Sequence, residues 1–128
     1  MEQRIIREYM LLGGAAMAKL EKSHVAVFGL GGVGSWCAEA LARSGVGTLT
    51  LVDQDTVGES NINRQLCALD STVGKGKAEV MAARIADINP SVCVRPVVGC
   101  YCAEERERFF DAYDYVVDAI DLVKHKVD

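Results

Sequence analysis

A cluster of glycines in the first third of the chain has the spacing of a phosphate-binding backbone. Gly29, Gly31 and Gly34 form the pattern G-x-G-x-x-G, with Gly32 inside it. The first glycine permits a tight turn, the second lets the backbone approach phosphate, and the third lets a helix pack closely. An apolar segment precedes the pattern and a helical pattern follows it, which is the required context. Because N–H groups at a helix start attract anions, the pattern predicts a phosphate-binding loop.

A carboxylate follows this loop at the position where nucleotide-binding folds hold a ribose. Asp53 ends an apolar segment about 20 residues beyond the loop, which is the expected spacing. We expect Asp53 to accept hydrogen bonds from ribose hydroxyls, with Asp55 in the same nucleotide-binding turn. The alternative is that Asp53 caps a turn at the end of a strand.

Two cations favour a triphosphate over the pyrophosphate of NAD. Arg64 and Lys77 follow Asp53, and their charge suits a polyphosphate whose extra negative charge must be neutralised during attack at phosphorus. Arg64 could contact two phosphate oxygens and Lys77 could act as a point charge. Asn61 and Gln65 could add neutral hydrogen bonds. The alternative is that both cations are exposed residues that only promote solubility.

A further carboxylate predicts a divalent cation beside the phosphates. Asp121 lies just beyond the last predicted strand, at the same edge as the glycine loop. A carboxylate facing a polyphosphate requires a bridging cation, and Mg²⁺ is commonly held by one or two carboxylates plus phosphate oxygens. We therefore predict Asp121 as the metal ligand and Arg64, Lys77 and Asp121 as catalytic residues. Asp118, within the strand, is expected to be structural.

The elements that must position these residues alternate between strands and helices. The alternation predicts βαβ units in a parallel sheet, with helices on both faces. The expected fold class is therefore α/β, a Rossmann-like sheet truncated after about four strands. The apolar residues 48–53 predict a strand that is buried on both faces. The expected strands are 24–28, 48–53, 92–98 and 115–119, and the expected helices are 32–44, 75–89 and 103–113.

The chain is expected to have two parts. Residues 1–22 show apolar positions at helical spacing and are predicted to form an N-terminal helical segment, divided at Gly13 and Gly14. Residues 23–128 are predicted to form the nucleotide-binding part, incomplete at its C-terminal end. A fourth strand left as a bare sheet edge would be prone to aggregate, which favours a piece of a longer protein.

The composition argues against several other classes of protein. A net charge of −4 gives no support to non-specific nucleic-acid binding. No apolar stretch is long enough to cross a bilayer. The odd number of cysteines and the lack of CxxC spacing favour reduced thiols in a cytoplasmic protein over a disulfide framework or a metal site. These cysteines are Cys37, Cys67, Cys93, Cys100 and Cys102.

These motifs together resemble the ubiquitin-activating-like adenylyltransferases of the ThiF/MoeB/HesA superfamily, which includes the sulfur-carrier adenylyltransferases of molybdopterin and thiamine biosynthesis. The resemblance runs from about Arg7 to the last residue. It rests on GLGGVG (29–34), DQDTV (53–57), SNINRQ (60–65), VGKGK (73–77), INP (88–90) and DAID (118–121). Within the superfamily, the chain most resembles the tRNA threonylcarbamoyladenosine dehydratases, on GGVGS (31–35), AEALAR (38–43), NRQ (63–65), KAEVM (77–81) and DAID (118–121).

The resemblance implies roles for individual residues. Arg7 aligns with an arginine that reaches the ATP of a neighbouring subunit in relatives, so a homodimer with two shared sites is implied. Asp121 would orient Mg²⁺. The residues implied to bind ATP are Arg7, Gly29, Gly31, Gly32, Gly34, Asp53, Asp55, Asn61, Arg64, Gln65 and Lys77.

The reaction implied by the resemblance is ATP-dependent activation of the threonylcarbamoyl carboxylate on a modified tRNA adenosine, followed by ring closure. No general base is needed, because a carboxylate is ionised at neutral pH. Three alternatives remain: adenylation of a ubiquitin-like sulfur-carrier protein, an NAD-dependent oxidoreductase, and a nucleotide-binding or scaffold module without catalysis. The family fold continues with an acceptor-binding half, so residues 1–128 alone are expected to be inactive.

Overall fold

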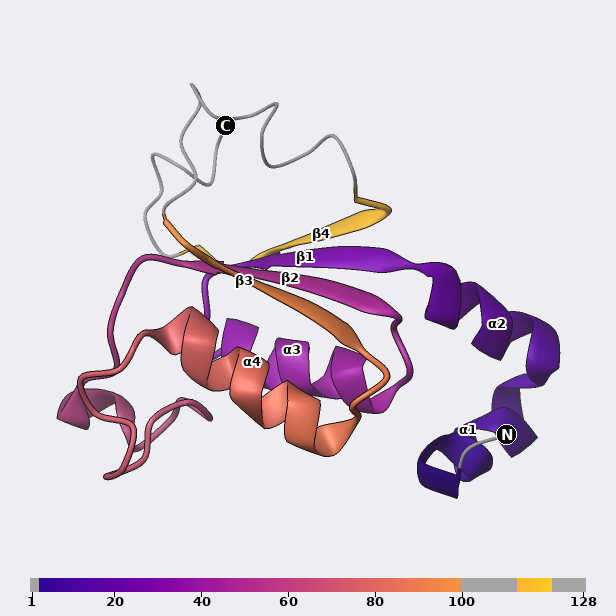
Figure 1. Cartoon of the computed structure of the whole chain (residues 1–128), viewed down its shortest axis with the longest axis horizontal. Coiled ribbons are helices and arrows are strands. Elements are labelled where there is room, and N and C mark those ends of the chain that lie inside the picture. The colour runs from indigo at the N-terminus through magenta and orange to yellow at the C-terminus, as the bar shows by residue number, and fades with distance from the viewer. Residues whose placement is uncertain (1–2, 100–112, 121–128) are drawn as a thin grey trace.

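A four-stranded parallel sheet organises the computed structural model, which describes residues 3–99 and 113–120. The strand order is β3-β2-β1-β4, so β1 and β2 occupy the centre (Figure 1). The α/β parallel architecture is therefore confirmed, and the observed strands differ from the expected ones by at most one residue at an end. The predicted helix at 103–113 falls outside the described residues, except for the non-helical Tyr113. The strands are β1 (His24–Phe28), β2 (Thr48–Asp53), β3 (Cys93–Val98) and β4 (Tyr115–Asp118).

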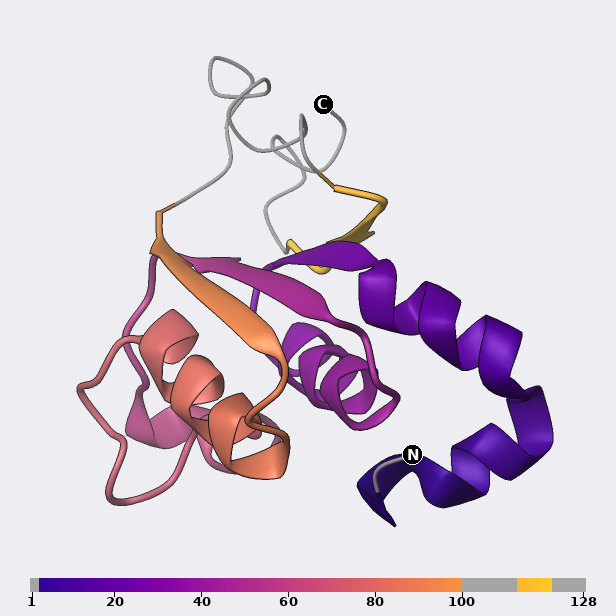
Figure 2. The same cartoon turned by 45° about the vertical axis from the view of Figure 1, so that its right-hand side comes forward.

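Two helices cover one face of the sheet. Both α3 (Gly34–Arg43) and α4 (Lys77–Ile88) lie on the same side of the strands (Figures 1 and 2). Because side chains alternate along a strand, β1 and β2 contribute to two cores. One core contacts these helices and the other contains Ala26, Phe28 and Val52. The predicted burial of β2 on both faces is confirmed, since its four central residues are buried.

Both helices are shorter than the sequence pattern predicted. The helix expected at 32–44 is α3, in which residues 32 and 33 instead belong to the preceding turn. The helix expected at 75–89 is α4, which begins only at Lys77. Gly76 is extended, with ψ 132°, and pairs with Thr56, while the carbonyl of Lys75 accepts the Val57 N–H at 2.8 Å. These hydrogen bonds to the segment after β2 hold residues 75 and 76 out of the helix.

The N-terminal segment forms an arm at the amino end of β1. It contains η1 (Gln3–Ile5), α1 (Ile6–Leu12) and α2 (Gly14–Lys22), so the predicted division of the helix at Gly13 and Gly14 is confirmed. Figure 2 shows that the arm extends from the end of β1 opposite the glycine loop. No helix among the described residues combines the length and apolar character needed to span a membrane.

Candidate functional site

The glycine loop turns sharply between β1 and α3. Gly29 has a φ of +93° and its N–H donates to the carbonyl of Val52 at 2.9 Å. A Cβ on Gly29 would lie 2.5 Å from the carbonyl oxygen of Ala119, and a Cβ on Gly34 would lie 1.7 Å from that of Gly29. Both positions therefore require glycine. The close approach at Gly34 is to the loop itself and to Ala119, which follows β4, rather than to a residue within β1.

The centre of the loop offers backbone donors at the start of α3. Within the described ranges, the N–H groups of Gly31, Gly32 and Val33 have no protein acceptor. The carbonyl of Gly31 is already used, since it accepts the Ser35 N–H at 3.1 Å. Free N–H groups at a helix start form an electropositive site for an anion. The loop thus has the local geometry expected of a phosphate-binding turn.

Asp53 connects the end of β2 to the glycine loop. Its Oδ2 accepts the Leu30 N–H at 2.7 Å and its Oδ1 accepts the Asp55 N–H at 2.8 Å. The turn-capping alternative therefore describes a real contact. Each carboxylate oxygen can accept further hydrogen bonds, so this contact is compatible with ribose binding. The carbonyl of Asp55 in turn accepts the Lys77 N–H at 3.0 Å, which links the same turn to the start of α4.

Arg64 and Gln65 lie against the glycine loop. A Cβ on Gly32 would be 3.7 Å from Cγ of Arg64, and a Cβ on Gly31 would be 3.6 Å from Nε2 of Gln65. Gln65 is only 8% exposed, whereas Arg64 is exposed. The structure therefore brings together two predicted site residues and the loop, although 30 or more positions separate them in the sequence.

The side chains of Arg64 and Asn61 make hydrogen bonds within their own segment. Nη1 of Arg64 donates to the carbonyl of Ser60 at 3.1 Å and to Oδ1 of Asn63 at 2.9 Å. Oδ1 of Asn61 accepts the Gly58 N–H at 2.9 Å at the start of η2 (Glu59–Asn61). Asn61 thus stabilises the turn that precedes Arg64. Its predicted contact with phosphate stays a prediction.

Lys77 is a nearly buried cation at the same edge of the sheet. It is 7% exposed, so the alternative of a merely solubilising residue is wrong for Lys77. Burial raises the pKa of the Cys67 thiol; the charge of Lys77 acts in the opposite direction and that of Asp53 in the same direction. Both charges therefore act on the buried thiol. Cys67, which sequence reasoning left without a role, lies with Sγ 3.8 Å from the carbonyl oxygen of Leu30.

Three other predicted residues do not join this cluster in the described structure. Arg7 is exposed on α1, at the opposite end of β1. Asp121 lies outside the described residues. Asp118 ends β4 and its Oδ1 accepts the Ile120 N–H at 3.2 Å, which fits the structural role expected for it.

Sequence reasoning missed two residues that contact the Arg64 segment. Ser35 is fully buried and its hydroxyl accepts the Leu66 N–H at 3.2 Å. Trp36 donates its indole N–H to the carbonyl of Arg64 at 3.1 Å. Ser35 had entered only as the last residue of the motif GGVGS, and the only signal for Trp36 was its position two residues after the last glycine of the loop.

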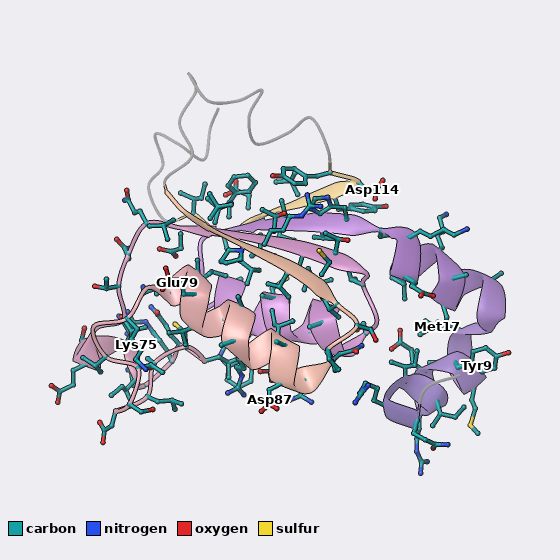
Figure 3. The ribbon with its side chains drawn as sticks, in the orientation of Figure 1. Tyr9, Met17, Lys75, Glu79, Asp87 and Asp114 are labelled. Atoms are coloured by element: carbon teal, nitrogen blue, oxygen red, sulfur yellow. The ribbon has the colours of Figure 1, made fainter. Side chains whose placement is uncertain are left out.

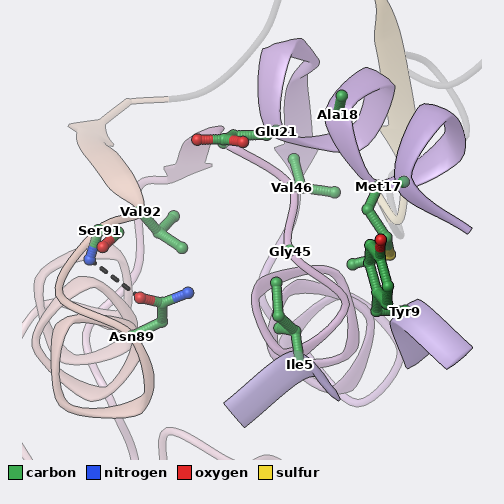
Figure 4. A pocket seen from close by; sticks show the side chains of 12 residues that line it. Ile5, Tyr9, Met17, Ala18, Glu21, Gly45, Val46, Asn89, Ser91 and Val92 are labelled. Atoms are coloured by element: carbon green, nitrogen blue, oxygen red, sulfur yellow. Dashed lines mark hydrogen bonds between the residues drawn. The ribbon is translucent and has the colours of Figure 1, made fainter. Parts of the chain in front are cut away.

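A cavity of about 440 Å³ lies at the amino end of the sheet, between the N-terminal arm and the turns that precede β2 and β3. Tyr9 and Met17 line one side and Asn89 lines the other, where its Oδ1 accepts the Ser91 N–H at 3.0 Å (Figure 4). Figure 3 places Tyr9 and Met17 at this amino end and Lys75 at the opposite end. None of the predicted nucleotide-binding residues lines this cavity.

The chain is similar over nearly its whole length to longer proteins of known activity. It is 52% identical over 122 residues to the tRNA threonylcarbamoyladenosine dehydratase of Bacillus subtilis, covering 94% of this chain and 48% of the relative. It is 39% identical over 104 residues to the molybdopterin-synthase adenylyltransferase of Escherichia coli, covering 81% of this chain and 42% of that protein. The chain thus spans about half the length of the curated relatives that it matches.

Comparison with solved structures points to the same group of adenylating enzymes and dehydratases as the sequence comparison. The crystal structure of Escherichia coli tRNA N6-threonylcarbamoyladenosine dehydratase in complex with ATP matches with a TM-score of 0.95 and 46% identity, covering 97% of this chain and 51% of that chain. A second structure of that protein, in complex with AMP, matches equally well. A model of the ThiF family matches residues 3–128. The resemblance seen in the sequence is therefore confirmed, and the chain belongs to the ThiF family.

Proposed function

We propose that this protein binds ATP at the glycine loop and uses it to activate a carboxylate. The acceptor that we propose is the threonylcarbamoyl carboxylate of a modified tRNA adenosine. Support comes from the 52% identity to the Bacillus subtilis dehydratase and from the ATP complex of the 46% identical Escherichia coli dehydratase. Loss of water, which ring closure of the activated carboxylate would achieve, is proposed because both relatives are dehydratases.

The observation that carries the proposal is the unpaired charge of Lys77. Its side chain is 7% exposed, and within the described residues neither Lys77 nor Arg64 forms an ion pair with a carboxylate. Among the described side chains, no fully buried nitrogen lacks a hydrogen-bond partner, so the stem of Lys77 is buried while its ammonium still reaches solvent and is available to an opposite charge. A phosphate group beside the free N–H groups of the loop would supply that charge.

The chain's own groups suit attack at the α-phosphorus. An oxygen of the acceptor carboxylate bonds to this phosphorus while the bond to the bridging oxygen of the β-phosphate breaks, and pyrophosphate leaves. The amides of the loop, Arg64 and Lys77 would stabilise negative charge on the phosphates. Asp53 would accept hydrogen bonds from the ribose. Positioning is the main requirement, because the attacking carboxylate is already ionised.

We also propose Asp121 as the Mg²⁺ ligand. The carbonyl of Ala119 lies against Gly29, so β4 brings the chain to the glycine loop two residues before Asp121. Mg²⁺ usually binds one or two carboxylates and completes its coordination with water and substrate phosphate oxygens, which a single aspartate beside a triphosphate would satisfy. Such an ion would neutralise phosphate charge.

A homodimer with shared sites completes the proposal. Arg7 belongs to an arm at the far end of β1 and is too remote in the fold to be placed at its own glycine loop. Met10 and Leu11 on the same helix are 77% and 83% exposed, a surface suited to contact with a second copy. We propose that the arm of one subunit brings Arg7 to the nucleotide of its neighbour.

The first experiment is a titration of this chain with ATP·Mg²⁺ and with NAD. We expect a preference for ATP, and a loss of affinity of about 10- to 100-fold in Lys77→Ala and Arg64→Ala, because each removes a charged hydrogen-bond donor. Lys75→Ala is the matched control, since it removes an exposed cation only two residues from Lys77. Preference for NAD, or indifference to both site substitutions, would contradict the proposal.

A second experiment measures pyrophosphate release with modified tRNA and with a ubiquitin-like sulfur carrier. We expect these 128 residues to bind ATP without turnover, because about half of each relative lies outside the matched region and we propose that this half binds the acceptor. Release stimulated by modified tRNA would show that this half is dispensable. Release stimulated by the carrier protein would favour the second candidate, which the 39% identical adenylyltransferase supports.

A further inference from the structure

The segment that carries Arg64 is attached to the first turn of α3 at two points. The indole N–H of Trp36 donates to the carbonyl of Arg64 at 3.1 Å. The hydroxyl of Ser35 accepts the Leu66 N–H at 3.2 Å. These two bonds reach the peptide groups on either side of Gln65, so they fix both the position and the direction of the backbone there.

Ser35 also connects this attachment to the glycine loop. Its hydroxyl donates to the carbonyl of Gly31 at 2.6 Å while it accepts the Leu66 N–H. The side chain is fully buried, so water does not replace either partner. A single hydroxyl therefore links the loop that would hold phosphate to the segment that carries the cation.

Trp36 is placed differently from a core aromatic residue. It is 56% exposed and is the only tryptophan of the chain. A tryptophan whose ring remains exposed contributes less to the core than a buried one, because hydrophobic stabilisation scales with the area removed from water. The hydrogen bond from its indole N–H to the Arg64 carbonyl therefore explains the position of Trp36 better than core packing does.

The guanidinium of Arg64 depends on these attachments for its place at the loop. Its side-chain hydrogen bonds go to Ser60 and Asn63, which belong to the same segment and move with it. We propose that Ser35 and Trp36 are positioning residues that hold Arg64 over the glycine loop. The inference rests on the proposed function, because it takes Arg64 as a phosphate-binding residue.

The test is a double-mutant cycle on ATP affinity, measured by calorimetry on the purified chain. Trp36→Phe keeps an aromatic ring and removes the N–H donor, so we expect ATP to bind about three- to tenfold more weakly, the loss of one hydrogen bond. In the Arg64→Ala background, the same substitution should cost little more, because no guanidinium remains to be positioned. Tyr115→Phe, which alters an exposed aromatic residue at the start of β4, is the control and should leave the affinity unchanged.

The outcomes separate this inference from the proposed function. If the unsubstituted chain does not bind ATP, or if Arg64→Ala has no effect, the proposed function fails. If Arg64→Ala weakens binding while Trp36→Phe is silent, or if the two losses add fully, the positioning role is wrong and the proposed function stands. Melting temperatures verify that each variant is folded, and Ser35→Ala, taken through the same cycle with the same expected non-additivity, decides the question if Trp36→Phe does not fold.

Discussion

The two ends of the parallel sheet differ in what they collect. At the carboxyl end, the glycine loop, the carboxylate of Asp53, the nearly buried Lys77 and the fully buried Ser35 lie together. At the amino end, the arm and the body enclose a cavity of about 440 Å³, and most of the side chains that line it are apolar. The cavity has room for a ligand, whereas the other end has the charged and polar groups that phosphate requires.

The topology explains why chemistry gathers at only one end. All described strands are parallel, so their carboxyl ends meet at one edge, and both α3 and α4 begin there, at Gly34 and Lys77. The positive ends of two helix dipoles therefore point toward the same edge. Among the described residues, the convergence of donors at the carboxyl end, rather than the volume of the cavity at the amino end, identifies the candidate site.

The largest loss of stability is expected from substituting two glycines that pack against backbone carbonyls, one at each end of the sheet. A Cβ on Gly34 would lie 1.7 Å from the Gly29 carbonyl, and one on Gly47 would lie 1.7 Å from the Glu21 carbonyl. We expect Gly34→Ala and Gly47→Ala each to lower the free energy of unfolding by about 2–3 kcal/mol or more, in denaturant titrations. Only Gly34→Ala should also weaken ATP binding in the protein that remains folded.

Gly99→Ala is the matched control for these substitutions, since a Cβ there meets no described residue within 4 Å. It should change stability by less than about 0.5 kcal/mol. If Gly47→Ala impairs ATP binding as strongly as Gly34→Ala, the two ends are not functionally distinct.

Cysteine reactivity should distinguish the two ends next. Cys67 lies at the carboxyl end, fully buried, and burial raises the pKa of its thiol, so little reactive thiolate forms at neutral pH. Cys93 begins β3 at the amino end and is exposed. We expect alkylation of Cys67, followed by peptide mass spectrometry, to be about a hundredfold slower than that of Cys93. In denaturant, the two cysteines should be alkylated at equal rates. Equal alkylation rates in the folded chain as well would mean that the carboxyl end is not packed as described.

The smallest effect on stability is expected for a substitution midway along the sheet, where α3 and α4 contact each other. Glu39 forms ion pairs with Arg43 and Arg84, and the hydrogen bond from Arg84 is the main cause of the lowered pKa of Glu39. Glu39→Gln should reduce the free energy of unfolding by about 1 kcal/mol at pH 7, because both arginines are partly exposed and screened. ATP affinity should stay unchanged.

The pH dependence of this effect follows from the direction of the shift. A lowered pKa means that the folded state favours the ionised carboxyl group, so Glu39 contributes stability above its unfolded pKa of about 4.3. The difference between the original chain and Glu39→Gln should therefore shrink as pH falls below that value. Asp87→Asn, on the exposed side of α4, should show no such change; a difference that persists at low pH would mean that the ion pairs are not its cause.

Much of the fold could be predicted because the local signals agree. The apolar segments gave β1 and β2 at their observed bounds, and the alternation of elements gave the parallel topology. The start of α4 was predicted too early, because pairing of Gly76 with Thr56 and of Lys75 with Val57 holds these two residues outside the helix. Such pairing between distant segments leaves no periodic pattern in the sequence.

The candidate site was less predictable than the fold. The sequence could nominate Arg64 and Lys77 by charge, but the burial of Lys77 and the position of Arg64 beside the loop depend on how the connection after β2 folds back. The bonds of Asp53 to Leu30, and of Trp36 to Arg64, join segments 23 and 28 residues apart. Neither the position of these partners nor the burial of Ser35 follows from residue type alone.

The central claim is that the carboxyl end of the sheet binds a nucleoside triphosphate. Hydrogen–deuterium exchange of the chain, with and without ATP·Mg²⁺, tests this directly because it locates the protected amides. We predict slower exchange in residues 29–36 and 60–67, and no change at Asn89, Ser91, Val92 and residues 45–47, which line the cavity at the amino end. Protection confined to the residues around that cavity, or no protection at saturating ATP, would contradict the claim.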